Sequence, residues 1–259
     1  MHPSADPIPS RLAVPGPGEL EVWWTPIDLG EEVLSRAATA LDPISLAKAE
    51  RMRRDADRRR SLLAHALLRQ LLSAVTGTPP AELVLERRCA GCGATDHGRP
   101  YLSGGPSFGI SHGGDVAAVV LGAPDASVAV DVEAVQLPER WDAVRRHAFS
   151  ADEWDATAHD PGAGRTQLWA RKEAVVKATG HGLSIELTRI AFAHAAWATS
   201  TEHEPVDHGP LVVDIAPGEP AAPAGPWAAA DLDLADDHRA AVAWHGEPVA
   251  TITTHLAAL

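Results

Sequence analysis

The sequence predicts an α+β protein made of two halves of similar size, each with helices packed on a small, mainly antiparallel sheet. Helical character is concentrated in two regions, residues 39–74 and residues 141–179. Short runs with strand character accompany each region, and the turn-rich stretch 122–125 (GAPD) separates them. Helices grouped beside short strands in each half therefore indicate the α+β class.

The first half is expected to span residues 19–124, after a Pro-rich segment (residues 1–18) that is expected to be a flexible tail. Its first strand is ELEVWWTP, residues 19–26. The helical region that follows should form in two parts, because an apolar stripe at helix period occupies only its second part. Two further strands, residues 107–111 and 116–121, are expected to pair through a tight link with two glycines.

The second half is expected to span residues 125–259. It begins with the strand SVAVDVE (residues 127–133), and two helices are predicted after it, over residues 141–155 and 167–179. A Pro-, Gly- and Ala-rich stretch, residues 205–226, is expected to contain long loops. The later strands are predicted at residues 188–197, 210–215, 240–245 and 250–255.

Composition narrows the class of protein. The 259 residues are 45% hydrophobic and 22% charged, and no apolar run approaches the about 20 residues that cross a bilayer. Two cysteines and no signal-peptide pattern favour a cytoplasmic protein without a disulfide framework. Residues 101–259 hold 9 basic and 22 acidic side chains, which disfavours nucleic acid as a partner. Neither nucleic acid nor a membrane is therefore expected as a partner.

Two carboxylates follow one another at strand period. Asp131 and Glu133 lie two residues apart, so they share a face of the predicted strand, while the valines between them cover the other face. Side-by-side carboxylates repel unless a cation lies between them, and Mg²⁺ favours one or two such ligands together with substrate phosphates. The alternative is a solvated strand end with two acidic residues.

A third carboxylate occurs in the helical segment WARKEAVVK, residues 169–177. Glu173 and Lys177 are four residues apart, so they lie on one helix face. This pattern fits a metal-binding carboxylate with a lysine that neutralises a phosphate. The alternative is an ordinary helix ion pair worth about 0.3–0.5 kcal/mol.

Two further segments contain candidate anion-binding residues. Ser111 and His112 end a predicted strand at its tight link, where backbone N–H groups and side chains can meet an anion. A nucleophilic pair is disfavoured there, because adjacent strand residues face opposite sides. Arg60 and Ser61 lead into the apolar stripe of a helix, with Lys48 earlier in a basic segment, a plausible place for phosphate. The alternative for the basic segment is a solvated helix face.

Taken in order, these segments resemble the Sfp-type (surfactin-type) 4′-phosphopantetheinyl transferases. The resemblance runs from about residue 42 to residue 194, and its ordered motifs are RRSLL, GRP, FGISH, VDVE and WARKEAVVK. It implies two α+β halves related by a pseudo-twofold axis, with coenzyme A bound between them. The implied reaction is Mg²⁺-dependent transfer of 4′-phosphopantetheine to a serine of an apo acyl or peptidyl carrier protein, such as those of polyketide and nonribosomal peptide synthases. Members of this size are often monomeric.

The resemblance also implies roles for individual residues. Asp131, Glu133 and Glu173 would hold Mg²⁺, and Lys177 would assist departure of adenosine 3′,5′-bisphosphate. Glu173, or Glu133 through a water, is the candidate general base. The residues that match coenzyme A-binding positions are Lys48, Arg60, Ser61, Arg99, Ser111 and His112. Arg99 stands where lysine is more usual, and Ser61 stands where threonine is common.

Three rival interpretations remain. Cys89 and Cys92, with His97 nearby, offer at most three ligands for a structural zinc ion that prefers four, which His147, His159 or His194 could supply. A metal-dependent phosphoesterase could use the same three carboxylates. A coenzyme A-binding protein without catalytic activity is the third interpretation.

Overall fold

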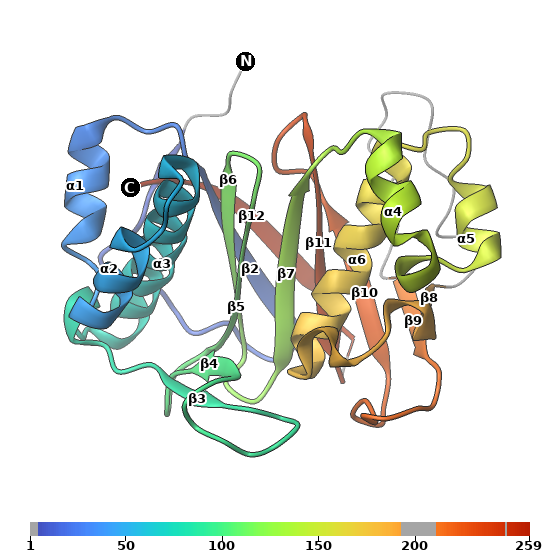
Figure 1. Cartoon of the computed structure of the whole chain (residues 1–259). Coiled ribbons are helices and arrows are strands. Elements are labelled where there is room, and N and C mark those ends of the chain that lie inside the picture. Colours follow the sequence, from blue (N-terminus) through green and yellow to red (C-terminus); the bar gives the residue numbers. More distant parts are fainter. Residues whose placement is uncertain (1–4, 193–210, 247) are drawn as a thin grey trace.

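Two five-stranded sheets form the centre of the molecule, with helices on their outer faces (Figure 1). The computed structural model describes residues 5–192, 211–246 and 248–259. Strand order is β1-β12-β2-β6-β5 in the first sheet and β7-β11-β10-β9-β8 in the second, with a separate two-stranded ribbon, β3-β4. Helices α1–α3 cover the first sheet and α4–α6 cover the second. The α+β prediction with two similar halves is confirmed.

The first half matches its predicted elements closely. β2 (Glu19–Pro26) coincides with the predicted strand, and the helical region divides into two helices as expected. An additional helix, α1, was not predicted, because it is short and buries only Leu34 and Ala37. The remaining elements are α1 (Glu31–Ala38), α2 (Pro43–Glu50), α3 (Asp55–Thr76), β3 (Glu86–Arg88), β4 (Arg99–Tyr101), β5 (Ser107–Gly113) and β6 (Val116–Gly122), with a short 3-10 helix at Pro80–Glu82.

The second half differs from its prediction at two points. The single helix predicted over residues 141–155 is wrong: the chain breaks at Phe149, and Ser150 starts a new helix. The Ser150 Oγ accepts from the Glu153 N–H (3.2 Å) and the Ser150 N–H donates to Glu153 Oε2 (2.7 Å), which is a complete capping box. A strand at residues 227–232 was not predicted.

The elements of the second half are β7 (Ser127–Ala134), α4 (Pro138–Ala148), α5 (Ala151–Ala156), α6 (Ala163–Thr179), β8 (Ile190–Phe192), β9 (Leu211–Ile215), β10 (Trp227–Leu232) and β11 (His238–His245). Two short 3-10 helices, Gly182–Ser184 and Leu187–Arg189, connect α6 to β8. Half of the strand predicted at residues 188–197 falls outside the described residues, and β8 forms within the other half.

The end of the chain returns to the first sheet. β12 (Thr251–Ala258) pairs with β2 in parallel, and β1 (Asp6–Pro7) pairs with β12. The Leu12 N–H also donates to the Ala74 carbonyl (3.0 Å), so the tail expected over residues 1–18 contacts the body at β1 and at Leu12. We therefore propose that the chain passes from the first half to the second near residue 124. β12, at the end of the chain, returns to the sheet of the first half.

The apolar core between the sheets fixes the orientation of β7. Val128, Val130 and Val132 are buried against the first sheet, so the alternate residues Ala129, Asp131 and Glu133 face α6. A slip of one residue would turn Asp131 and Glu133 into this apolar core in place of the valines, and burying unpaired charge is costly, so the packing specifies this register. The shared face that was predicted for Asp131 and Glu133 follows from this packing.

The two sheets also meet edge to edge at β5 and β7. Gly113 permits the close approach, because a Cβ at that position would lie 2.2 Å from the Val132 carbonyl oxygen. Any larger residue would force the strands apart. Within the described residues, no helix combines the length and apolar character needed to cross a bilayer.

Candidate functional site

Charged side chains from β7 and α6 converge where the edges of the two sheets meet. β7 supplies Asp131 and Glu133, and α6 supplies Glu173 and Lys177 from one helix face. β5 of the first sheet supplies Ser111. The structure therefore brings together five of the residues singled out from the sequence, across a sequence separation of 66 residues between Ser111 and Lys177.

Lys177 is the cation at the centre of this cluster. Its Nζ lies 2.5 Å from Asp131 Oδ1 and 3.0 Å from Ser111 Oγ. The Ser111 hydroxyl also lies 2.9 Å from Asp131 Oδ1, and it accepts from the Val132 N–H (3.3 Å). The simple Glu173–Lys177 helix pair weighed in the sequence analysis is thus not the ion pair that forms, because Lys177 reaches across to β7 instead.

The remaining carboxylate atoms are poorly compensated. Asp131 Oδ2 and Glu173 Oε1 are buried and have no hydrogen-bond partner within the described part of the chain. Glu133 Oε1 accepts from Trp169 Nε1, at 3.2 Å. Burial and then the charge of Asp131 raise the pKa of Glu133 from 4.5 to about 7, and the same two causes raise the pKa of Glu173.

This chemistry fits a hard divalent cation. Carboxylate oxygens are the donors that Mg²⁺ prefers, and two of them here are buried and unpartnered among the described residues. A cation there would offset the lost hydration and the repulsion that raise the two glutamate pKa values. The carboxylate oxygens are not yet gathered as a set of metal ligands. Among the described residues, only Cys89, Cys92 and His97 hold three potential metal-ligand atoms within 4.8 Å of one another. To bind an ion, the three carboxylates would therefore have to move closer together, and Lys177 would have to give up its bond to Asp131 Oδ1.

A pocket of about 470 Å³ opens beside Lys177 between the two halves. Its walls come from β4, β5, β7 and the C-terminal end of α6. Phe108, Ile110 and Ala129 give it an apolar side, while Arg99 and Lys177 supply positive charge. Such a pocket, mostly apolar with a few charged groups, is typical of small-molecule sites.

Arg99 lines this pocket and also joins its walls. Its Nη2 donates to the Phe108 carbonyl (2.9 Å) and the Val128 carbonyl (2.7 Å), and its Nη1 lies 3.4 Å from the Ala178 carbonyl. The guanidinium therefore connects β5, β7 and α6 in this structure. A phosphate-binding role for Arg99 stays a prediction.

The basic residues of α3 lie next to the turn between β5 and β6. Arg60 Nε donates to the Gly114 carbonyl (2.5 Å), and Ser61 is buried one residue later. His112 lies near the end of β5 with part of its side chain exposed; partial loss of hydration and then the charges of Lys177, His65 and Arg60 lower its pKa. These groups thus form a polar rim on the first half, in which Arg60 carries the positive charge and also pairs with Asp57.

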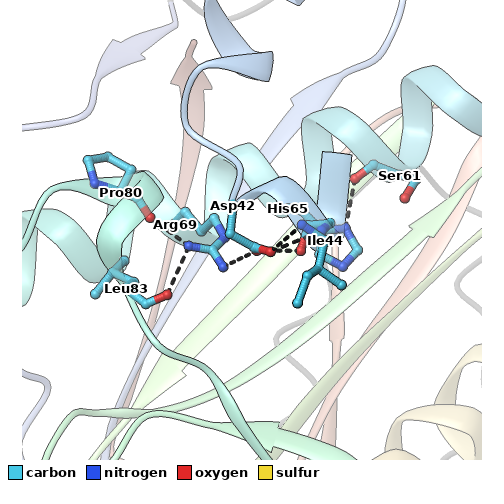
Figure 2. Close-up of polar contacts among 8 residues, drawn as sticks. Asp42, Ile44, Ser61, His65, Arg69, Pro80 and Leu83 are labelled. Atoms are coloured by element: carbon cyan, nitrogen blue, oxygen red, sulfur yellow. Dashed lines mark hydrogen bonds and ion pairs between the residues drawn. The ribbon is translucent and has the colours of Figure 1, made fainter. Parts of the chain in front are cut away.

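His65 belongs to this rim but was not identified from the sequence. Its Nδ1 lies 2.7 Å from the Ser61 carbonyl, one helical turn earlier, and the exposed Lys48 of α2 is among the charges that lower its pKa after burial. Figure 2 shows how α2 is fixed beside α3: the buried Arg69 pairs with Asp42, which caps α2, and donates to the Pro80 carbonyl (2.6 Å). In the sequence, the only sign that His65 belongs to this rim is its position four residues after Ser61, one helical turn away.

The comparisons with known proteins agree with this geometry. A family model described as "4′-phosphopantetheinyl transferase, N-terminal" matches residues 23–124, and one described as "4′-phosphopantetheinyl transferase superfamily" matches residues 127–243. The 4′-phosphopantetheinyl transferase psf-1 of Bacillus pumilus is 30% identical over 181 residues, which cover 68% of this chain and 73% of that protein. The chain belongs to the 4′-phosphopantetheinyl transferase family.

Two further relatives show a similar likeness. The phosphopantetheinyl transferase of Thraustochytrium sp. is 29% identical over 201 residues, which cover 68% of this chain and 66% of that protein. The human L-aminoadipate-semialdehyde dehydrogenase-phosphopantetheinyl transferase is 30% identical over 149 residues, 52% of this chain. The match covers 47% of the human protein, so this chain spans about half of its length.

Proposed function

We propose that this family member is an Sfp-type enzyme that transfers the 4′-phosphopantetheine of coenzyme A to a serine of an apo carrier protein. The proposed partners are acyl or peptidyl carrier proteins, including carrier domains of polyketide and nonribosomal peptide synthases. We further propose that it requires Mg²⁺ and acts as a cytoplasmic monomer.

One observation supports this proposal above the others. Buried oxygens of Asp131 and Glu173, unpartnered among the described residues, lie beside Lys177, and Lys177 lines a pocket between the two halves. A purely structural cluster would satisfy these oxygens, since leaving a buried polar atom unpaired costs about 1–3 kcal/mol. Such an arrangement suits a site that completes its contacts only with ligands bound.

The pocket and its rim divide the work of binding coenzyme A. The diphosphate would approach Lys177, and the apolar wall at Phe108 and Ile110 would hold an uncharged part of the molecule. On the first half, the residues proposed for the nucleotide and its phosphates are Lys48, Arg60, Ser61, Arg99, Ser111 and His112. Positioning by these groups supplies much of the catalysis in phosphoryl-type transfer.

The proposed reaction is a single displacement at phosphorus. The carrier serine oxygen bonds to the phosphorus that bears the pantetheine arm, and the bond from that phosphorus to the bridging oxygen of the diphosphate breaks. Adenosine 3′,5′-bisphosphate leaves with the bridging oxygen and its electron pair. The serine proton passes to Glu173, or to Glu133 through a water.

The protein provides charge rather than a nucleophile of its own. Lys177 would stabilise negative charge on the leaving group from its place between Asp131 and Ser111. Asp131, Glu133 and Glu173 are the residues proposed to hold Mg²⁺. When bound, the ion would offset charge on the diphosphate oxygens.

Release of adenosine 3′,5′-bisphosphate tests the proposal against its rivals. With coenzyme A and Mg²⁺ present, we expect release only when an apo carrier protein is added, at one molecule per modified serine. A phosphoesterase would cleave coenzyme A equally well without carrier, and a binding protein would release nothing. Either of these outcomes would overturn the proposed transfer.

A further inference from the structure

The loop between β3 and β4 contains a second cluster of metal-binding side chains. Ligand atoms of Cys89, Cys92 and His97 all lie within 4.8 Å of one another, and Cys92 Sγ is 3.4 Å from His97 Nε2. Cys92 and His97 are exposed, and Cys89 is partly exposed. The cluster is formed within nine residues of chain, so no distant segment is required to complete it.

The backbone of this loop folds around the Cys89 sulfur. The Cys89 N–H donates to the Ala94 carbonyl and the Gly93 N–H donates to the Cys89 carbonyl, both at 2.9 Å. Gly93 has a φ of 74°, a conformation that disfavours side chains, and it lets the chain reverse directly after Cys92. The N–H groups of Cys92 and Gly91 also bond to the Cys89 sulfur.

His97 is held in the orientation that a metal ligand needs. Its Nδ1 lies 2.6 Å from Asp96 Oδ1, where the carboxylate can accept the Nδ1 proton, and its Nε2 faces Cys92 Sγ. Histidines that bind metals almost always donate their second nitrogen to a carboxylate or carbonyl in this way. Neither a pair of ordinary surface thiols nor a disulfide requires an oriented histidine.

We propose that Cys89, Cys92 and His97 bind one Zn²⁺ ion, with a water molecule at the fourth position. Two thiolates and an imidazole are the donors that select zinc over magnesium or calcium. This site is therefore separate in chemistry from the carboxylate cluster, which offers oxygen donors only. It is the three-ligand site with one open position, rather than the four-ligand structural site first considered.

The ion would fix one wall of the pocket. Cys89 and His97 line the same pocket as Lys177, and Arg99 follows His97 by two residues. Arg99 in turn bonds to carbonyls of β5, β7 and α6. Zinc would thus hold the loop in the position from which Arg99 reaches the seam between the halves.

Cobalt titration of the reduced, metal-free full-length protein tests this site without coenzyme A or a carrier. We expect one Co²⁺ per chain, with intense thiolate-to-cobalt charge-transfer absorption that disappears when Zn²⁺ is added. Cys92→Ser should lose the charge-transfer band, whereas His147→Ala, which removes an exposed histidine outside the cluster, should keep it. Asp96→Ala should weaken binding about 10- to 100-fold, because it releases His97.

Thermal unfolding of the metal-free wild type and Cys92→Ser controls for folding, and the two should unfold alike because Cys92 is exposed. Absence of the band in reduced wild-type protein would overturn the zinc site, as would its persistence in Cys92→Ser. A Cys89–Cys92 disulfide that forms in air, together with no cobalt binding after reduction, would assign the pair to redox chemistry instead. None of these results depends on whether the transferase proposal is correct.

Discussion

Helix α6 carries two lysine–carboxylate pairs that differ in how completely they are satisfied. Lys172 is fully buried, and its Nζ donates to Glu153 Oε2 (2.6 Å) and to the carbonyls of Ala148 (2.9 Å) and Leu187 (3.0 Å). Lys177 lies five residues later with a side chain 35% exposed, and it bonds to Asp131 and Ser111. All three donor positions of Lys172 are therefore used within the fold.

The difference separates a structural contact from a site. Lys172 ties α6 to α5 and to the ends of α4 and the 3-10 helix before β8, and it leaves nothing for a ligand. The Lys177 pair leaves Asp131 Oδ2 unpartnered and lies beside two glutamates whose pKa values are raised. Unused, desolvated charge next to a pocket is the more informative sign of function.

Removal of Lys172 should give the largest effect on stability. Lys172→Ala leaves Glu153 buried without its partner, so we expect the free energy of unfolding to fall by about 3–5 kcal/mol. Mg²⁺ should not restore it, because no other cation fits that enclosed place. Urea unfolding with and without Mg²⁺ measures both points, and a wild-type midpoint would show that the buried pair is dispensable.

Removal of the site carboxylates should act on turnover instead. Asp131→Ala, Glu133→Ala and Glu173→Ala should each reduce transfer by about 100- to 1,000-fold, comparable to the loss of a charge-stabilising group in other active sites. Circular dichroism should show the fold unchanged. Glu139→Ala removes an exposed carboxylate elsewhere and serves as the matched control. Wild-type rates in all three variants would contradict the metal-site proposal.

Lys177→Ala sharpens the contrast with Lys172→Ala. Transfer should fall by about 100-fold, and the metal-free protein should lose some stability because Asp131 is left uncompensated. Here Mg²⁺ should restore the lost stability, since a cation can take the vacated place. Stability that stays low with Mg²⁺ would mean that the carboxylates do not hold the ion.

The smallest effect concerns the pH dependence of stability. Because the pKa of Glu133 rises from 4.5 in the unfolded chain to about 7, the folded state binds its proton more tightly, and stability falls as pH rises between these values. In metal-free protein, Glu133→Gln should remove this fall and gain up to about 3 kcal/mol above pH 7. Equal unfolding profiles for the variant and the wild type between pH 4.5 and 8 would refute the assignment.

Local patterns in the sequence predicted much of this site. The alternation of β7 placed Asp131 and Glu133 on one face, and helix spacing placed Glu173 with Lys177. The ion-pair partner of Lys177 could not be predicted, because Lys177 meets Asp131 only when α6 packs on β7. The burial of Lys172 could not be predicted either, because it depends on the packing of α6 against α5.

The errors in the fold have similar causes. The parallel pairing of β12 with β2 joins opposite ends of the chain, and no local pattern reports it. The break in the helix predicted over residues 141–155 did have a local signal, since Ser150 and Glu153 form the S-x-x-E pattern of a capping box. That signal was outweighed by the helical character on either side of it.

The most direct test of the proposed reaction is the intact mass of an apo carrier protein incubated with this protein and coenzyme A. A chelator would strip both the proposed Mg²⁺ and the proposed Zn²⁺, so Mg²⁺ alone should be added back after chelation. We predict that the carrier gains the mass of one phosphopantetheine arm with Mg²⁺ and none without it. No gain on several acyl and peptidyl carriers, despite measurable coenzyme A binding, would contradict the account.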